Sequence, residues 1–200
     1  EDMRKEVLRQ SNKTLHYPVD PTSREEAMVG GTLSCNASGF IPGPAGATRF
    51  WTEGLDFLTA DGYKISCRRG DYVSENGEFI MEYPDKSVIL TIPTYPRPEI
   101  KNASGPFSDV NGRIDLVDFL VGSEGIFGVI TSAIFALKEM PDDFLDLFFT
   151  LPKELDAVHF HQYISNHFNG DLSQITALEY FGYNCQTYMN HREKLFNSTS

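Results

Sequence analysis

The sequence predicts an α+β fold, a mixed sheet with flanking helices, and three observations lead to it. Two strand-like stretches, 50–60 and 63–69, are joined by Asp61-Gly62, a pair that favours a type I′ hairpin turn. The nearly continuous apolar run from Val129 to Leu137 is typical of a buried, central strand. Short helices are expected over 27–34, before the hairpin, and over 114–120, between the hairpin and the apolar strand.

The remaining elements follow from local composition. Short strands are expected over 15–19 and, after the hairpin, a turn-rich stretch over 70–113 with apolar segments at 79–81 and 88–92. A change in composition near Met140-Pro141 predicts a boundary, which gives two domains, 1–141 and 142–200. The second domain is expected to contain strands over 144–151 and 175–181 and helices over 155–168 and 186–196.

Composition excludes several classes of function. The chain has 200 residues, a net charge of −11 and 40% hydrophobic residues, as expected of a soluble globular protein. The acidic balance argues against binding to nucleic acid or anionic lipid, and no apolar run reaches the roughly 18 residues of a membrane span. Three widely spaced cysteines form neither a disulfide framework nor a zinc motif, so buried, reduced thiols in a cytoplasmic protein are expected.

The stretch from Pro18 to Gly39 is the first candidate site. Pro18 and Pro21 bracket an extended turn, and Thr22 or Ser23 can cap a short helix. The small residues that follow, Gly30-Gly31 and Asn36-Ala37-Ser38-Gly39, allow a backbone to approach a ligand closely, and their N–H groups can form an anion-binding nest. Two interpretations remain open: a loop against a phosphate-bearing cofactor, or a capped turn between two core elements.

A second glycine-rich stretch, Gly-Ser-Glu-Gly-Ile-Phe-Gly-Val-Ile-Thr at 122–131, runs into the apolar strand. Together with the Pro-x-Asp-Pro turn, Gly-Gly and Asn-Ala-Ser-Gly, in that order, it resembles the FAD-binding domain of the vanillyl-alcohol oxidase and p-cresol methylhydroxylase superfamily. The most similar branch is that of the glycolate oxidase large subunit, D-lactate dehydrogenase and D-2-hydroxyglutarate dehydrogenase. The segments 58–62 and 101–105 match further motifs of this branch, and the resemblance covers roughly 15–141.

The resemblance implies that 1–141 is the C-terminal part of a PCMH-type FAD-binding domain and that 142–200 begins a substrate or cap domain. It implies non-covalent FAD, and it places the turn-rich stretch over the cofactor or a domain interface. For Glu124, a hydrogen bond to the cofactor and a cap on the Ile126 backbone are both open. The residues matched to cofactor contacts are Pro21, Thr22, Gly30, Gly31, Asn36, Ala37, Ser38, Gly39, Gly122, Glu124, Gly125, Gly128, Val129 and Ile130.

The sequence departs from the family pattern at three places. The glycine-rich phosphate loop that precedes the proline turn and the later His-rich catalytic segment have no counterpart in these 200 residues. The tyrosine-glycine step after Gly39 is replaced by Ile-Pro-Gly-Pro-Ala-Gly at 41–46. The chain is therefore expected to be a piece of a longer protein, and to be neither a catalyst nor a tight FAD binder by itself.

The resemblance implies an FAD-dependent oxidoreductase that oxidises a small 2-hydroxy acid, such as D-lactate or glycolate, by hydride transfer to flavin. The electron acceptor is not identified, and the expected location is the cytoplasm, with a position peripheral to the inner face of the membrane as the alternative. Alternatives are the flavin-dependent ether-lipid (alkylglycerone-phosphate) synthase of the same superfamily and a non-catalytic module that has lost the flavin. No catalytic residue is assigned. His159, His161 and His167 lack metal-ligand spacing. Glu179 stands where the resembling family often carries an acid in its cap domain, and a strand-end carboxylate is an equally good interpretation.

Overall fold

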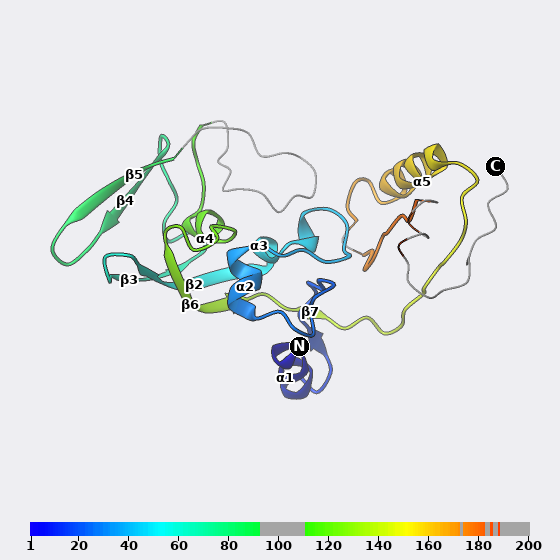
Figure 1. Ribbon diagram of the computed structural model, residues 1–200, viewed down its shortest axis with the longest axis horizontal. Helices are drawn as coiled ribbons and strands as arrows, with labels where there is room; N and C mark the ends of the chain where they lie inside the picture. The colour runs from blue at the N-terminus through cyan, green and yellow to red at the C-terminus, as the bar shows by residue number, and fades with distance from the viewer. Residues whose placement is uncertain (93–110, 173, 183–184, 186–187, 189–200) are drawn as a thin grey trace. The chain divides into compact units, whose positions relative to one another are not determined.

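The computed structural model describes residues 1–92, 111–172, 174–182, 185 and 188, and it divides into two compact units, Glu1–Met140 and Pro141–Ser200 (Figure 1). The mixture of helices and strands confirms the α+β class. The assignment of the two units as part of an FAD-binding domain and the start of a cap domain stays a prediction. The elements of the first unit are α1 Asp2–Gln10, β1 Leu15–His16, α2 Val29–Ser34, the 3-10 turn η1 Pro44–Gly46, α3 Thr48–Trp51, β2 Thr52–Thr59, β3 Lys64–Arg68, β4 Glu78–Glu82, β5 Ser87–Thr91, α4 Leu116–Leu120, β6 Gly128–Phe135 and β7 Lys138–Glu139.

The main sheet has three strands in the order β3-β2-β6, with α2 and α4 packed against it (Figure 1). Inward-facing residues of the central strand, Leu55 and Phe57, are buried beneath α4, because successive strand side chains alternate between the two faces. Leu33 of α2 belongs to the same core. The buried core residues are Leu33, Leu55, Phe57, Cys67, Phe79, Met81, Ile92, Ile114, Leu116, Val117, Phe119, Leu120 and Val121.

The prediction that the apolar run 129–137 forms a buried central strand of a mixed sheet is wrong in two respects. The strand exists as β6 and pairs with β2, but it lies at the edge of the sheet, and Val129 is 61% exposed. Ile130, Ala133 and Phe135 pack against the core, and the alternation of strand side chains sends Val129 to the other face. All strand pairs among the described residues are antiparallel, so the sheet is not mixed in this part of the chain.

The β2–β3 hairpin forms where the sequence predicts it, but its turn type differs. Gly62 has a φ of 88°, whereas Asp61 does not adopt a positive φ, so the turn is not type I′. The Thr59 amide donates to the Tyr63 carbonyl (2.9 Å), which gives a three-residue loop closed by a left-handed glycine. A type I′ pair occurs instead at Asn76-Gly77, where both φ angles are positive (52° and 78°).

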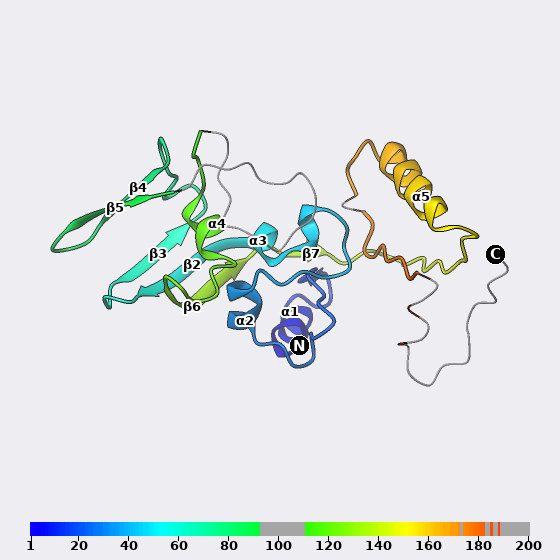
Figure 2. The same cartoon turned by 45° about the horizontal axis from the view of Figure 1, so that its top comes forward.

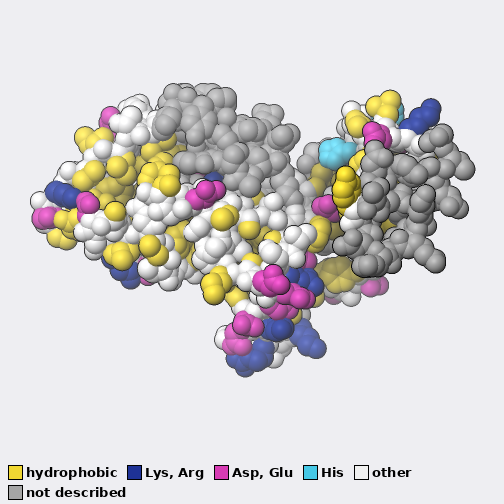
Figure 3. All heavy atoms as spheres, in the orientation of Figure 1, with side chains coloured by type: hydrophobic (Ala, Val, Ile, Leu, Met, Phe, Trp, Pro, Cys, Tyr) yellow, Lys and Arg dark blue, Asp and Glu magenta, His cyan; other side chains and the backbone are white. Residues whose placement is uncertain are grey.

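The turn-rich stretch over 70–113 contains a second hairpin, β4–β5, while residues 93–110 lie outside the described part of the chain. The tips of the two hairpins lie side by side in Figures 1 and 2. They are joined by the Tyr63 hydroxyl, which donates to the Asp85 carboxylate (2.6 Å), and by Lys86, which donates to Asp61 (3.0 Å). Hydrophobic side chains lie exposed over the β4–β5 hairpin, among them the cross-strand pair Ile80 and Ile89 (Figure 3).

The two ends of the first unit meet in the β1–β7 ladder, in which His16 pairs with Lys138. The strand expected over 15–19 is shorter than predicted and stops at His16. Charged side chains gather on α1 (Figure 3), and Arg4 fixes this helix by donating to the Val19 carbonyl (2.6 Å). The helix expected after Thr22 is a run of turns, because residues 22–26 are exposed and have no apolar face to pack.

In the second unit, the predicted helix over 155–168 is confirmed as α5, Glu154–His167, whose N-terminal end is fixed by the Lys153 amide donating to Asp156 (3.2 Å). The segments 144–151 and 175–181 are not strands, so the expected β-α-β pattern is wrong within the described residues. A strand needs the backbone groups of a partner strand, and the described part of this unit contains no strand with which either segment could pair. The helix expected over 186–196 lies outside the described residues, apart from Tyr188. No helix within the described ranges has the length and apolar character needed to cross a membrane.

Candidate functional site

The two glycine-rich stretches, separated by more than eighty residues of sequence, lie side by side in the structure. We call residues 28–39 the first loop and residues 122–128 the second loop. The Gly122 amide donates to the Leu33 carbonyl (2.8 Å), and the Glu124 amide donates to the Ser34 carbonyl (2.9 Å). These two bonds satisfy carbonyls at the C-terminal end of α2, which a short helix leaves without intrahelical partners. The second loop therefore fixes the end of α2, and α2 also contacts β6 (Figure 1).

Gly30 and Gly31 lie in α2 with open space beside them. A Cβ built on either residue meets no heavy atom within 4 Å, so the packing of the described residues does not require glycine there. Glycine in a helix costs stability relative to alanine, and here no internal contact offsets that cost. The pair leaves an uncovered strip of backbone on the first loop, next to the exposed side chain of Met28, which is 80% exposed.

Two other predicted cofactor glycines have a packing role. A Cβ on Gly39 would come within 2.5 Å of the Asp20 backbone nitrogen, and a Cβ on Gly128 would come within 2.1 Å of the Leu58 carbonyl oxygen. Both distances are far below any real Cβ contact. Gly122 and Gly125 have φ angles of 85° and 80°, a region that favours glycine. Close packing or backbone conformation can therefore explain glycine at these four positions without a cofactor, whereas neither explains Gly30 and Gly31.

The Asn-Ala-Ser segment of the first loop is held by its neighbours. Asn36 is fully buried with a φ of 47°, and its Oδ1 accepts from the Arg49 amide (2.8 Å). The Ala37 carbonyl accepts from both the amide and the hydroxyl of Thr48, and Ser38 forms a β-bridge with Ala47. These bonds anchor the first loop to the segment that follows it.

The segment 41–46, where the sequence departs from the family pattern, folds back on the first loop. The Gly39 amide donates to the Gly46 carbonyl (2.9 Å), and the indole Nε1 of Trp51 donates to the Ala45 carbonyl (2.7 Å). Pro44–Gly46 forms the 3-10 turn η1 between these anchors. The proline-rich segment 41–46 is therefore hydrogen-bonded to the end of the first loop and to Trp51.

The second loop carries the remaining predicted residues. Glu124 is exposed with a φ of 52°, and the Ile126 amide donates to the Ser123 carbonyl, so Glu124 is not required as the cap of that amide. Ile126 is 74% exposed. Val129 and Ile130 belong to β6, where they pair with β2, and only Ile130 packs against the core.

Pro21 and Thr22 line a hollow of about 510 Å³ around the proline turn, together with Asp20, residues 23–26 and Phe40. The acidic side chain of Asp20 is paired with Arg24 at 3.1 Å. Because Gly39 packs on the Asp20 backbone, this hollow adjoins the end of the first loop.

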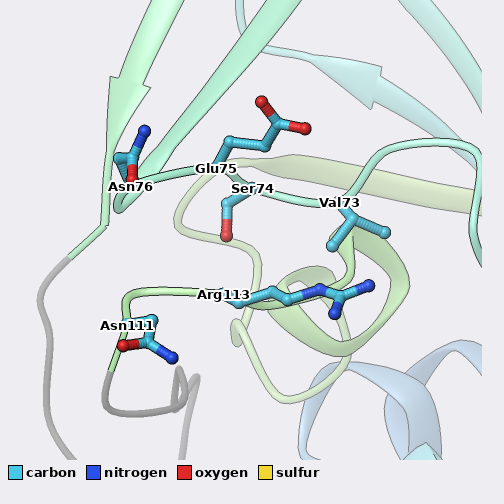
Figure 4. A pocket seen from close by; sticks show the side chains of 6 residues that line it. All are labelled: Val73, Ser74, Glu75, Asn76, Asn111 and Arg113. Carbon is cyan, nitrogen blue, oxygen red and sulfur yellow. The ribbon is translucent and has the colours of Figure 1, made fainter.

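A second hollow, of about 380 Å³, contains no residue that the sequence predicts for the site (Figure 4). It is lined by Val73, Ser74, Glu75, Asn76, Asn111 and Arg113. The buried hydroxyl of Ser74 donates to the Gly112 carbonyl and accepts from the Ile114 amide, both at 2.7 Å. This serine therefore holds the chain leading to α4.

The other chemistry-bearing residues form no second site within the described ranges. No group of three or more His, Cys, Asp or Glu among those residues could hold a metal ion. Cys67 is buried, and burial raises the pKa of its thiol to about 11, whereas Cys35, contrary to expectation, is exposed. Burial, with a smaller contribution from Arg4 and Lys138, lowers the pKa of His16.

Arg49 is a site residue that the sequence prediction missed. It lies in α3, is 6% exposed, and contacts Asn36 of the first loop and Val121, the residue that precedes the second loop. The only signal in the sequence is a cation in an otherwise uncharged run, 45–52, that leads into a strand. A pattern of this kind does not reveal what the cation contacts.

The structure defines an α+β protein with a three-stranded antiparallel sheet and two adjoining glycine-rich loops. No protein-family model matches the chain. Over 131 residues it is 28% identical to the glycolate oxidase subunit GlcD of Bacillus subtilis (strain 168). The match takes in 66% of this chain and 20% of that protein, so the chain spans about a fifth of the relative's length.

Proposed function

We propose that this chain provides two loops of an FAD site in an oxidoreductase that oxidises a small 2-hydroxy acid such as D-lactate or glycolate. The proposal is carried by the pairing of the first and second loops through Gly122–Leu33 and Glu124–Ser34. Both loops match the same family pattern in sequence, and that pattern assigns both of them to one cofactor.

The residues present suit a flavin nucleotide. Beside the backbone strip at Gly30-Gly31 is open space that a Cβ would fill, as expected where a backbone must approach a ligand closely. Exposed apolar side chains flank this strip and the second loop, notably Met28 and Ile126, and they offer apolar surface to an aromatic ring system. With a net charge of −11, the chain would bind a diphosphate mainly through backbone N–H groups.

A bound FAD supplies the hydride acceptor that oxidation of a 2-hydroxy acid requires. The residues of this chain would contribute shape: the first loop provides the open backbone strip, and segment 41–46 holds the end of that loop through the bond from the Gly39 amide to the Gly46 carbonyl. The substrate class follows from the family pattern and agrees with the name of the Bacillus subtilis relative, a glycolate oxidase subunit. A cytoplasmic location is part of the same proposal, which leaves the electron acceptor open.

The test uses the full-length protein that contains this chain. It should purify with a flavin absorbance spectrum, and that flavin should bleach under anaerobic conditions when D-lactate or glycolate is added. A matched variant, Gly31→Val, should purify without flavin, because a branched side chain would occupy the open strip. Gly125→Val should lose flavin as well, with the added strain of its φ of 80°.

Three outcomes would contradict the proposal in different ways. Full-length protein without flavin would favour the non-catalytic module. A bound flavin that neither acid reduces would remove the substrate class and favour an enzyme such as the ether-lipid synthase. Gly31→Val protein that retains stoichiometric FAD would remove the first loop from the site.

A further inference from the structure

Arg49 places a buried cation against the residue that precedes the second loop. Its Nη2 donates to the Val121 carbonyl (2.6 Å), and the residue is 6% exposed. A buried guanidinium is costly unless its donors find acceptors, so its position is tightly specified by the groups it binds. Val121 directly precedes Gly122, the first residue of the second loop.

The contact acts on a single peptide unit. The carbonyl of Val121 and the amide of Gly122 belong to the same planar peptide group. Arg49 binds the oxygen of that peptide group. The N–H of the same group, which belongs to Gly122, donates to the Leu33 carbonyl of the first loop (2.8 Å). Because the peptide is planar, fixing the oxygen also fixes the direction of the N–H.

The main chain of Arg49 is itself held on both sides. Its amide donates to Oδ1 of the fully buried Asn36, which belongs to the first loop. Its carbonyl accepts from Nη2 of Arg69, which also pairs with Asp118 of α4 at 3.0 Å. Arg49 therefore connects the first loop with the residue that precedes the second loop, and Arg69 connects it with α4.

We propose that Arg49 is a positioning residue that sets the spacing of the two loops and, through that spacing, the affinity of the site for FAD without contacting the cofactor. The spacing of the loops follows from the hydrogen bonds of Arg49 with Asn36 and Val121. The effect on FAD affinity rests on the proposed function.

The experiment compares Arg49→Met and Arg49→Lys with wild-type full-length protein. Arg49→Met removes the guanidinium donors and keeps a long side chain. Arg49→Lys keeps the positive charge and an N–H donor. The control is Arg68→Met, which removes an exposed arginine of β3 outside the Arg49 contacts. Amide hydrogen exchange at Gly122 and Glu124, measured without added FAD, reports the loop spacing. Exchange at Leu55 and Cys67 in the β2–β3 ladder reports global stability.

Arg49→Met should accelerate exchange at Gly122 and Glu124 and leave the β2–β3 amides unchanged, with Arg49→Lys intermediate and Arg68→Met like wild type. FAD affinity should fall by about tenfold to a hundredfold in Arg49→Met, as expected for the loss of one charge-assisted hydrogen bond. If Arg49→Met does not fold, Arg49→Lys gives the same comparison.

Unchanged exchange at Gly122 and Glu124 in both Arg49 variants would overturn the positioning role. Equal acceleration at the loop and in the β2–β3 ladder would also overturn it, because that result indicates general destabilisation. Faster loop exchange with wild-type FAD affinity would overturn the link to the cofactor. Wild-type protein that binds no FAD would overturn that link together with the proposed function, and the exchange rates would still decide the positioning role.

Discussion

Gly39 lies directly against the backbone of Asp20, so close that a Cβ on Gly39 would stand 2.5 Å from the Asp20 nitrogen and 2.6 Å from its carbonyl oxygen. The end of the first loop is thereby packed on the proline turn, at a residue nineteen positions earlier in the sequence. The same kind of contact holds Gly128 against Leu58. Substitution by alanine should therefore lower the stability of the fold at Gly39 and Gly128 and should not lower it at the open pair Gly30-Gly31.

Gly39→Ala and Gly128→Ala should each destabilise the fold by about 1–3 kcal/mol, because the added methyl group overlaps backbone atoms that cannot rotate away. Urea unfolding of the 200-residue chain, followed by circular dichroism, measures the loss. Gly30→Ala is the matched control with open space beside it. Wild-type stability of either packing variant would contradict the close approach.

Gly31→Ala should stabilise the same chain by about 0.5–1 kcal/mol, because alanine loses less backbone freedom in a helix and meets no neighbouring atom here. In the full-length protein the same substitution should weaken FAD binding. Thermal unfolding without FAD and flavin titration together test the two signs. A variant that gains stability and keeps wild-type affinity would show that the open strip does not face the cofactor.

Asn36→Gly should cost about 1–3 kcal/mol, because it removes the buried acceptor of the Arg49 amide. Asn36→Ala should cost about 1–2 kcal/mol more, because alanine has no side-chain compensation for a φ of 47°. Urea midpoints of the two variants provide the comparison. Equal midpoints would mean that the left-handed backbone at this position is not retained in solution.

The stability of the chain should fall as the pH drops through the ordinary His16 pKa of 6.5. Burial and the nearby Arg4 and Lys138 lower the pKa of this histidine in the folded state, so the unfolded state binds the proton more readily. Protonation therefore favours unfolding below that pH. Urea midpoints at about pH 7 and about pH 5 should differ less in His16→Gln than in wild type. An equal difference in both proteins would assign the effect to other groups.

The 200-residue chain alone should bind FAD weakly and should not oxidise D-lactate. The family pattern includes a further glycine-rich phosphate loop that has no counterpart in this sequence. The absence of two or three charge-assisted hydrogen bonds can weaken binding by about a thousandfold or more. Calorimetric titration with FAD measures the affinity directly. A nanomolar dissociation constant, or turnover with an artificial acceptor, would contradict this expectation.

Local patterns predicted local structure well. The helix over 155–168 is observed one residue away at each end, and the hairpin around Asp61-Gly62 forms. The turn type was wrong because a three-residue loop also accepts glycine at its left-handed position, so Asp-Gly alone does not select a two-residue turn. The strand expected over 144–151 fails for a different reason, since its apolar pattern says nothing about whether a partner strand is present.

The position of β6 and the roles of individual site residues depend on contacts between distant parts of the chain. An apolar run predicts burial, but the order β3-β2-β6 leaves Val129 on an exposed edge strand. The sequence pattern assigned the two loops to one site. It could not distinguish Gly39, where the Asp20 backbone leaves no room for a Cβ, from Gly31, where a Cβ would meet no atom within 4 Å. Arg49 was missed because its partners, Asn36 and Val121, are fixed only in three dimensions.

The indole hydrogen bond from Trp51 to Ala45 gives the protein an intrinsic optical reporter. Trp51 is the single tryptophan of the chain, and its Nε1 is anchored to the segment that folds back on the first loop. Emission from an indole shifts to longer wavelength when water replaces a protein acceptor at its N–H. Fluorescence of the unlabelled 200-residue chain should therefore follow opening of segment 41–46 in real time, because these residues contain no second tryptophan to obscure the signal.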